Sequence, residues 1–186
     1  SIKFDGTTDY VKDTSYTAPS QLTTGSFAYW FKADALDAEY DAIDMFGSPS
    51  STHRVMSAVT ATNLAFFIAG SNPLNVAHSG IITAGQWHHR IDTWDTTGDI
   101  FKMYIDGVLK GTSTTATGDN TNISQLNVGI DKGNGYEWKG DLKDIRVYDS
   151  AITDAQADLL YKGQWNGSPY TWWKFNEGTG ATATDS

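Results

Sequence analysis

The sequence predicts an all-β fold, an antiparallel β-sandwich of the jelly-roll kind with one short α-helix toward its C-terminal side. Most segments alternate apolar and polar residues with a period of two, which indicates strands. Turn-forming Asp-Gly and Gly-rich stretches separate these segments at short intervals. Only one segment, near Thr153, begins as a helix does. Many short strands with one late helix are typical of two packed β-layers.

Two segments show the alternation most clearly. The faces of residues 26–32 carry Phe27, Tyr29 and Phe31 against Trp30 and Lys32. The faces of residues 86–94 carry Trp87, His89 and Ile91 against His88, Arg90, Asp92 and Trp94. We expect Trp30 and Trp94 on the outer face of a sheet, because successive side chains of a strand point to opposite sides. A second layer over that face, such as the helix or the last strand, is the alternative.

Turn and bulge signals follow these strands. Asp106-Gly107 predicts a type I′ hairpin, in which both central residues need positive φ. Further on, Leu142 is out of phase with Ile145 and Val147. A β-bulge near Lys143–Asp144 would place all three on one face, and a strand buried on both faces is the alternative.

The helix is predicted from its ends. Thr153 and Gln156 fit a capping box, in which each side chain satisfies a free backbone amide of the other. Ile152 can pack against Ala157 across the cap, and Gly163 suits the left-handed conformation that ends a helix. So short a helix must pack on a sheet to be stable.

Composition limits the domain count and the partners. The chain has 186 residues, no Cys and a net charge of −9. One domain, residues 1–186, is the default for this length. Nucleic acid and anionic membranes are poor partners because binding them rests on Lys and Arg. No apolar run approaches the ~20 residues of a membrane-spanning helix. Because the chain starts at Ser1, we interpret it as a piece of a longer protein.

Several motifs together resemble the laminin-G-like modules of the concanavalin A-like lectin/glucanase superfamily. Their order along the chain matches the family's order through about residue 163. The matching segments are Phe4-Asp5-Gly6 with Asp9-Tyr10-Val11, residues 27–32, Gln86-Trp87-His88-His89, residues 103–107, residues 140–148 and the helix that begins at Thr153. The resemblance implies a concanavalin A-like sandwich in a secreted, cell-surface or virion protein.

The last segment departs from the family order. Residues 172–180 resemble the strand with which such modules begin, yet here they lie at the end. Residues 170–186 either form a closing strand of this domain, as in a circular permutation, or start a next module. We favour the closing strand because a lone aromatic strand would be an exposed edge.

Catalytic chemistry has weak support. The superfamily's glucanases use paired carboxylates on one strand, and the nearest cluster here is Glu39, Asp41 and Asp44. Glu39 and Asp41 could share a face, but Asp44 should point the other way. The adjacent His88 and His89 point to opposite faces of a strand and are poorly placed to share a metal. We therefore predict that the chain is not an enzyme.

Calcium is the ion that the resemblance implies, since laminin-G-like modules often hold Ca²⁺ on their loops. Asp5 and Asp9 flank a turn, and Asp144 sits at the suspected bulge on a strand that could neighbour the first. We predict these three as ligands, with Asp141 as the near alternative to Asp144. The competing interpretation is that they are turn aspartates that cap their own backbone.

Aromatic side chains are the candidate ligand contacts. Sugar rings have apolar faces that stack on Trp and Tyr. We predict Tyr136, Trp138, Trp94 and Trp30 as contacts, with Tyr136 and Trp138 favoured because they flank a Gly-rich loop. The sequence thus predicts a non-catalytic carbohydrate-binding or adhesion module for a glycan or polysaccharide. A structural or protein-interaction module, such as a capsid decoration or fibre domain that binds other protein subunits, is the alternative.

Overall fold

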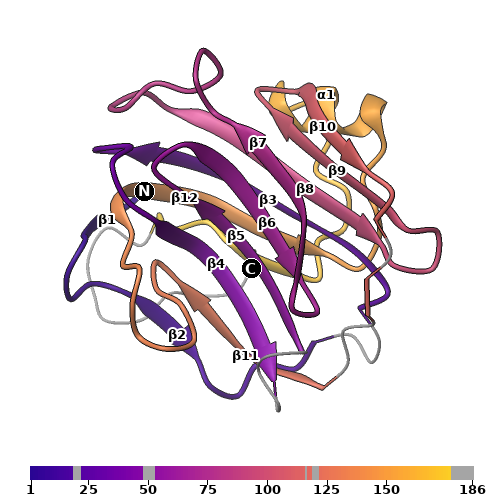
Figure 1. Ribbon diagram of the computed structural model, residues 1–186, viewed down its shortest axis with the longest axis horizontal. Helices are drawn as coiled ribbons and strands as arrows, with labels where there is room; N and C mark the ends of the chain where they lie inside the picture. The colour runs from indigo at the N-terminus through magenta and orange to yellow at the C-terminus, as the bar shows by residue number, and fades with distance from the viewer. Residues whose placement is uncertain (19–21, 48–52, 116, 119–121, 177–186) are drawn as a thin grey trace.

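The computed structural model describes residues 1–18, 22–47, 53–115, 117–118 and 122–176 (Figure 1). Nearly all of its regular structure is β. The elements are β1 (Ile2–Asp5), β2 (Val11–Asp13), β3 (Thr24–Ala33), β4 (Tyr40–Gly47), β5 (Arg54–Val59), β6 (Asn63–Ile68), β7 (Ser71–Ala77), β8 (His88–Asp95), β9 (Ile100–Ile105), β10 (Val108–Ser113), β11 (Ile123–Val128), β12 (Lys139–Tyr148), α1 (Asp154–Tyr161) and β13 (Thr171–Trp173).

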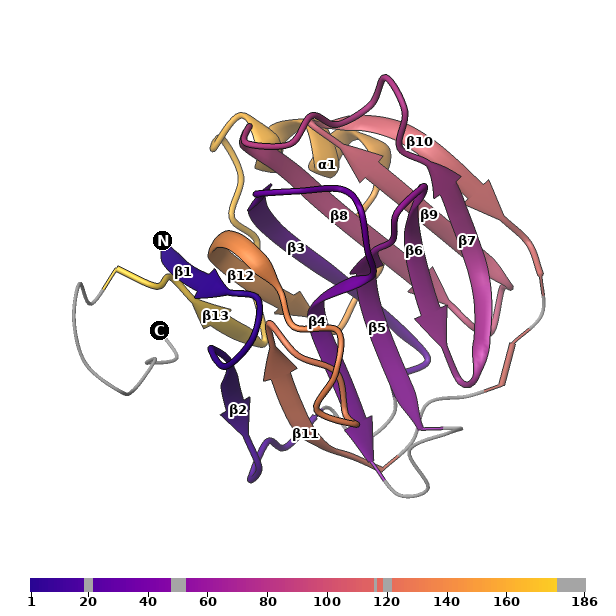
Figure 2. The ribbon, with the colours of Figure 1, turned by 60° about the vertical axis from the view of Figure 1, so that its left-hand side comes forward.

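The strands form two sheets that pack face to face. Sheet A has the order β1-β12-β3-β8-β9-β10, with β13 paired to β12, and sheet B has the order β2-β11-β4-β5-β6-β7. All the pairings between their strands are antiparallel. The turned view in Figure 2 shows β4, β5, β6 and β7 side by side in one layer. The predicted antiparallel β-sandwich is therefore confirmed.

One edge of β12 is shared by the two ends of the chain. β1 pairs with its first half, where Ile2 lies opposite Leu142, and β13 pairs with its second half, where Trp173 lies opposite Ile145. The Ser1 amino group donates a hydrogen bond to the Phe175 carbonyl at 3.0 Å. Residues 171–173 thus fold back onto this sandwich (Figure 2). Residues 177–186 of the expected closing segment lie outside the described residues.

The core lies between the sheets and is rich in aromatic residues. Phe27, Tyr29 and Phe31 alternate along β3 and are at most 1% exposed. They join a single large cluster with apolar residues from both sheets. The outward position of Trp30 on the same strand follows from the period-two pattern.

Trp94 was expected on the outer face, and this placement was wrong. Its indole is fully buried between the sheets, packs on Phe27 and Phe66, and donates a hydrogen bond to the Leu22 carbonyl at 3.0 Å. The reason lies two and four residues earlier in β8. Arg90 and Asp92 are both buried on the inner face, where they neutralise each other at 2.9 Å, so the charged side of this strand faces inward.

Trp138 is also buried, against the expectation of an exposed aromatic. Its side chain is 0% exposed and meets the rings of Phe31 and Tyr40 edge-on. Its backbone amide donates to the Gly129 carbonyl at 2.8 Å and so closes the Gly-rich loop. The loop turns its last residue into the core because that residue leads directly into β12.

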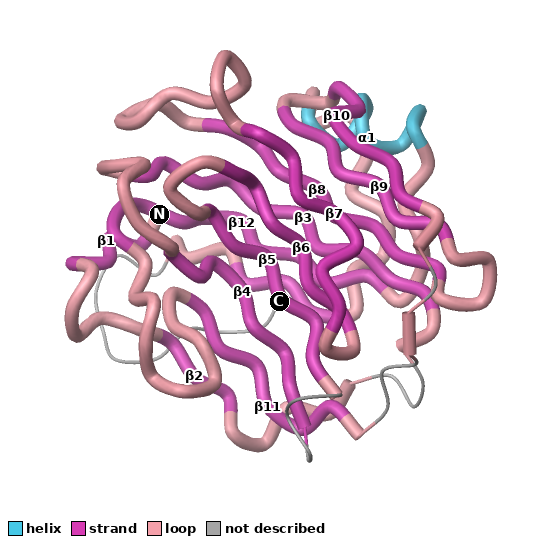
Figure 3. The backbone as a smooth tube through the Cα atoms, viewed as in Figure 1, coloured by secondary structure: helices cyan, strands magenta, loops and turns pink. Residues whose placement is uncertain are grey.

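The predicted turn and helix ends are confirmed. Asp106 and Gly107 both have positive φ, 52° and 77°, between β9 and β10. Thr153 and Gln156 form both halves of the capping box, and Gly163 follows the helix at φ 67°. Figure 3 shows α1 as the one helix among the described residues. Within those residues, no helix has the length and apolarity needed to cross a membrane.

Candidate functional site

The outer face of sheet A is divided into a covered and an open part. The segment around α1 covers one part through a small apolar cluster: Ala28, Ile91, Tyr104, Tyr148, Ile152, Ala157 and Leu160. The next outward residues of β3 are Trp30 and Lys32, which lie beyond this cluster and stay partly exposed. The open part of the face therefore begins at Trp30.

Four side chains from three segments meet on this open part, and we call them the tryptophan–lysine patch: Trp30, Lys32, Trp87 and Lys143. The Lys143 ammonium lies 4.3 Å from the ring centre of Trp87 and 5.2 Å from that of Trp30. The Lys32 ammonium lies 5.4 Å from the Trp87 ring centre. All four residues are partly exposed. The patch thus combines two indole rings with two cations at a solvent-accessible surface.

The strand register brings the patch together. Lys143 of β12 lies opposite Trp30 of β3, and Asp141 lies opposite Lys32. Lys32 is paired with Asp141 at 2.8 Å. Because directly opposed side chains on one sheet face lie about 5 Å apart, this register alone places the Lys143 ammonium near the Trp30 ring.

The loop before β8 fixes Trp87. The Gly85 amide donates to the Ala33 carbonyl at 2.8 Å, which ties the loop to the end of β3. His88, which follows Trp87, accepts a hydrogen bond from the Thr83 amide through Nε2 at 3.1 Å. Its Nδ1 therefore carries the proton and donates it to the Asp106 carboxylate at 2.8 Å. Trp87 is therefore held from both sides by backbone and imidazole contacts.

The predicted bulge in β12 is confirmed, and it shapes the same face. The pairing with β3 shifts between Lys143 and Arg146, and Asp144 has φ 53°. Because of the extra residue, Lys143 and Arg146 both point outward while Ile145 enters the core. The Arg146 guanidinium lies 4.3 Å from the ring centre of Trp172 and is held by both oxygens of Asp144.

His89 and Tyr161 border the patch on the side of α1. The His89 ring lies 5.0 Å from Trp30 and 6.1 Å from Tyr161, measured between ring centres. Burial lowers the pKa of His89 to about 4, with a smaller opposing effect of the Asp144 carboxylate. The His89 side chain is therefore an uncharged wall of the patch at physiological pH.

The structure does not bring the three predicted calcium ligands together. Asp5 lies opposite Lys139 in the sheet, and at about 3.3 Å per residue the stretch from Lys139 to Asp144 spans roughly 16 Å. Asp144 is occupied by Arg146 and by the Trp172 indole, which donates at 2.6 Å. Among the described residues, no group of three or more His, Asp or Glu side chains is arranged to hold a metal ion.

Asp5 and Asp9 instead cap a turn. The Asp5 carboxylate accepts hydrogen bonds from the backbone amides of Thr7 and Thr8 at 2.8 Å and from that of Asp9 at 3.2 Å. Asp9 in return accepts from the Asp5 amide at 3.1 Å. The hydrogen bonds from Thr8 and Thr7 hold the pKa of Asp5 well below its usual range. This network matches the competing interpretation, in which Asp5 and Asp9 are turn aspartates that cap their own backbone.

Tyr136 is the exposed aromatic of the Gly-rich loop, 52% accessible and at φ 54°. Its carbonyl accepts a hydrogen bond from the Asp41 amide of β4, so it lies beside sheet B. Trp30 lies on sheet A, and Trp94 and Trp138 are in the core. The four predicted contact residues therefore do not form one site, and a role for Trp30 or Tyr136 in ligand binding stays a prediction.

A buried acidic cluster on sheet B corrects one further expectation. Asp41 and Asp44 were expected on opposite faces, but the pairing with β5 shifts between Asp41 and Ile43 and places both on the outer face. Arg54 binds Asp44 with two hydrogen bonds of 2.8 and 2.9 Å. Both carboxylates are 0% exposed beneath the loop that begins at Asp131.

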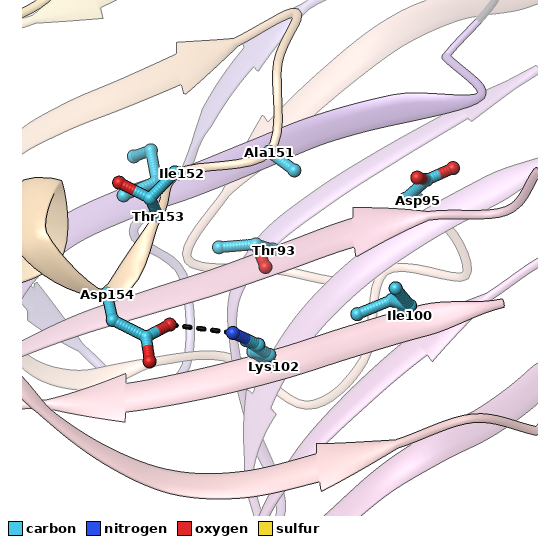
Figure 4. Close-up of a pocket in the computed structure, with 8 residues that line it drawn as sticks. All are labelled: Thr93, Asp95, Ile100, Lys102, Ala151, Ile152, Thr153 and Asp154. Carbon is cyan, nitrogen blue, oxygen red and sulfur yellow. Dashed lines mark hydrogen bonds and ion pairs between the residues drawn. The ribbon is translucent and has the colours of Figure 1, made fainter. Parts of the chain in front are cut away.

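A small pocket lies at the N-terminal end of α1 (Figure 4). Its volume is about 200 Å³, and its lining residues are Thr93, Asp95, Ile100, Lys102, Ala151, Ile152, Thr153 and Asp154. Figure 4 shows the Lys102 ammonium directed at Asp154, at 2.6 Å. Because these two charges satisfy each other and the volume is below the ~300 Å³ of most ligand sites, the pocket is a weaker candidate than the patch.

The two antiparallel sheets packed face to face define a concanavalin A-like sandwich. The sequence model of the concanavalin A-like lectin/glucanases superfamily matches residues 5–158, and the chain belongs to this superfamily. The predicted family relationship is thus confirmed. A comparison with curated protein sequences gives no match.

Solved structures show the same fold at low sequence identity. A heptameric SAP-like pentraxin from Limulus polyphemus is 17% identical with a TM-score of 0.76, and the match covers 99% of this chain and 90% of that one. A putative carbohydrate-binding protein from Bacteroides ovatus is 12% identical with a TM-score of 0.71, covering 100% and 56%. The CBM40 of the Ruminococcus gnavus IT-sialidase, solved with α2,3-sialyllactose, is 12% identical with a TM-score of 0.61, covering 74% and 82%.

Proposed function

We propose that this protein is a non-catalytic carbohydrate-binding module whose ligand contacts the tryptophan–lysine patch. The observation that carries the proposal is the pair of partly exposed indole rings, Trp30 and Trp87, on the open part of a sheet face. Indole rings offer flat apolar surface that suits the C–H face of a sugar ring, and they lose little conformational entropy on binding. The Lys32 ammonium lies near the Trp87 ring and is paired with Asp141, so hydrogen-bonding groups adjoin the stacking surface.

The lysines over the rings do not block such a ligand. A cation–π contact at an exposed site contributes only about 0.5–1 kcal/mol. The Lys143 ammonium sits at the end of a flexible four-carbon chain and can move aside while its charge stays near the ring. Trp87 itself is held by the loop contacts of Gly85 and His88, so the stacking surface is preformed.

The comparisons support the class of ligand but not the site. The Bacteroides ovatus protein is described as a carbohydrate-binding protein, and the Ruminococcus gnavus domain was solved with a sialylated sugar. One fold carries many functions, so the proposal rests on the patch. We further propose that the module belongs to a larger secreted, cell-surface or virion protein, as the family resemblance implies.

Titration calorimetry of the chain against a panel of soluble oligosaccharides tests the proposal. We expect Trp87→Ala to weaken binding at least about tenfold, since a buried aromatic anchor contributes about 2 kcal/mol or more. Trp165→Ala is the matched control, because that indole is also partly exposed but stacks on Tyr148 outside the patch. Each titration is repeated with a chelator, which tests the predicted calcium dependence.

Two results would contradict the proposal. One is the absence of binding to every oligosaccharide of the panel, with and without calcium. The other is equal loss of affinity in Trp87→Ala and Trp165→Ala at unchanged thermal stability, which would place the ligand elsewhere.

A protein-interaction module is the second candidate function. Val108 is 55% exposed and Leu159 is 37% exposed, and the turn at Gly107 adjoins Tyr161 of α1. Exposed apolar side chains gathered at one place favour contact with another protein. Sedimentation that shows self-association, weakened by Val108→Asp, together with a negative glycan panel would favour this function over the first.

A further inference from the structure

The charge of the tryptophan–lysine patch is opposite to that of the molecule. The chain has 22 acidic and 13 basic residues, so most surface lysines are expected to form an ion pair with a carboxylate. Lys3, Lys102 and Lys162 do so. In the part of the chain that the structure describes, Lys143 takes part in no ion pair, and its ammonium lies over two indole rings instead.

A second cation, the Lys32 ammonium, lies near the Trp87 ring that Lys143 contacts. The Lys32 ammonium is 5.4 Å from the Trp87 ring centre, on which Lys143 also lies. Asp141 neutralises Lys32 at 2.8 Å but leaves Lys143 without a countercharge. Lys143 therefore keeps a positive charge over the Trp87 ring that is unpaired among the described residues, and an anionic group on a bound ligand would pair with it.

The same pattern continues along the face of β12 and β13. Arg146 and Lys174 each place their cationic group 4.3 Å from the ring centre of Trp172. Asp144 neutralises Arg146, whereas none of the ion pairs among the described residues includes Lys174. Trp172 and Trp30 lie on strands that flank β12, so cations and rings alternate across three adjacent strands.

Building on the proposed function, we propose that the patch selects acidic glycans, with Lys143 binding a carboxylate or sulfate group while the Trp87 ring stacks on the sugar that carries it. A hydrogen bond to a charged group is worth more than one between neutral groups. The uncharged His89 ring adds no competing charge beside Trp30. Lys143 is then the residue that decides between acidic and neutral sugars.

The test uses matched pairs of probes that differ only in the anionic group. Trigalacturonate is compared with its methyl ester, and a sulfated galactan oligomer with its desulfated form, by titration calorimetry with the full chain. We expect the acidic member of at least one pair to bind about tenfold tighter. Which pair shows the preference distinguishes a carboxylate from a sulfate. The preference should shrink in about 0.5 M NaCl because salt screens exposed charges.

Substitutions locate the preference at the patch. Lys143→Gln keeps most of the length of the side chain and removes its charge, so it should weaken binding of the acidic probe about tenfold and give the acidic and neutral members of a pair the same affinity. Lys110→Gln, on the exposed side of β10, is the control and should retain the preference. Thermal melts check that both variants fold like the wild type.

The outcomes separate the two proposals. Equal affinity for acidic and neutral probes, or a preference that survives in Lys143→Gln, would overturn this inference, while loss of neutral-sugar binding in Trp87→Ala would still support a carbohydrate-binding module. Failure to bind any probe of either pair or of the wider panel would overturn both. Tight binding of an anionic vesicle of phosphatidylserine with no glycan binding would assign the patch to a different ligand and overturn both as well.

Discussion

At the residue scale, Asp41 and Asp44 are two equally buried carboxylates that differ in how well they are paired. Asp44 is bound through both oxygens by Arg54 and also accepts the Lys132 amide at 2.8 Å. Asp41 has no hydrogen-bond partner for either carboxylate oxygen among the described residues, and its contact with Arg54 is a longer 3.5 Å. Burial, reinforced by the Asp44 charge, raises the pKa of Asp41 well above its ordinary 3.8.

We therefore expect Asp41→Asn to stabilise the protein by about 1–2 kcal/mol at pH ~8. A carboxyl group with a raised folded-state pKa contributes stability below its unfolded pKa and loses it as the pH rises through the folded value. The advantage of Asp41→Asn should thus grow with pH and vanish near pH ~3, below the unfolded pKa. Urea denaturation across the range from about pH 3 to about pH 9 measures it.

Asp44→Asn is the matched control for this prediction. It breaks a buried, hydrogen-bonded ion pair and should cost about 3 kcal/mol at neutral pH. Equal destabilisation by Asp41→Asn and Asp44→Asn would contradict the prediction, because it would mean that the Asp41 carboxylate is paired as strongly as that of Asp44.

At the element scale, α1 depends on its first turn. The helix has eight residues and buries only Ala157 and Leu160, so its own propensity contributes little. Thr153 supplies both the capping hydroxyl and the amide that Gln156 satisfies at 2.9 Å. Tyr161, the last residue of the helix, borders the tryptophan–lysine patch with its ring centre 5.7 Å from that of Trp30.

We expect Thr153→Ala to lower the free energy of unfolding by about 1 kcal/mol, whereas Thr153→Ser keeps the capping hydroxyl and should stay close to the wild type. Chemical denaturation of the three proteins under one set of conditions compares them. Equal stability of the Ala and Ser variants would show that the sheet, and not the cap, determines where the helix starts.

At the scale of the whole molecule, a polar network joins the two sheets through the apolar core. Arg90 of sheet A donates hydrogen bonds to the carbonyls of Ala58 and Ala65 in sheet B, each at 2.7 Å. Asp92 accepts from Ser57 of sheet B at 2.5 Å. The Arg90–Asp92 pair is fully buried, so removing one partner leaves an uncompensated charge between the layers.

We expect Arg90→Met to destabilise the protein by about 3–5 kcal/mol and the double variant Arg90→Met/Asp92→Leu to recover much of that loss, because an apolar pair of similar volume needs no countercharge. Urea denaturation of the two variants measures the coupling. A double variant no more stable than the single one would show that the hydrogen bonds to sheet B, and not the ion pair, hold the sheets in register.

Local backbone chemistry made several features predictable. The hairpin at Asp106-Gly107, the capping box at Thr153 and the bulge at Asp144 each depend on residues within a few positions of one another. The core-facing residues of β3 were equally clear, since Phe27, Tyr29 and Phe31 recur at every second position and all lie in the core. Such features follow from steric limits on φ and ψ and from the period of two.

The sequence by itself determined the class of fold, the superfamily, the turns and the helix that begins after Thr153, because these follow from local patterns and from motif order. Only the tertiary structure decided which face of β8 is inner, since a buried Arg90–Asp92 pair looks like a solvated one until its partners on sheet B are known. It also decided that Trp94 and Trp138 fill the core and that Lys143 meets Trp30 and Trp87. Those contacts depend on the register between strands that are far apart in the chain, which no local rule fixes.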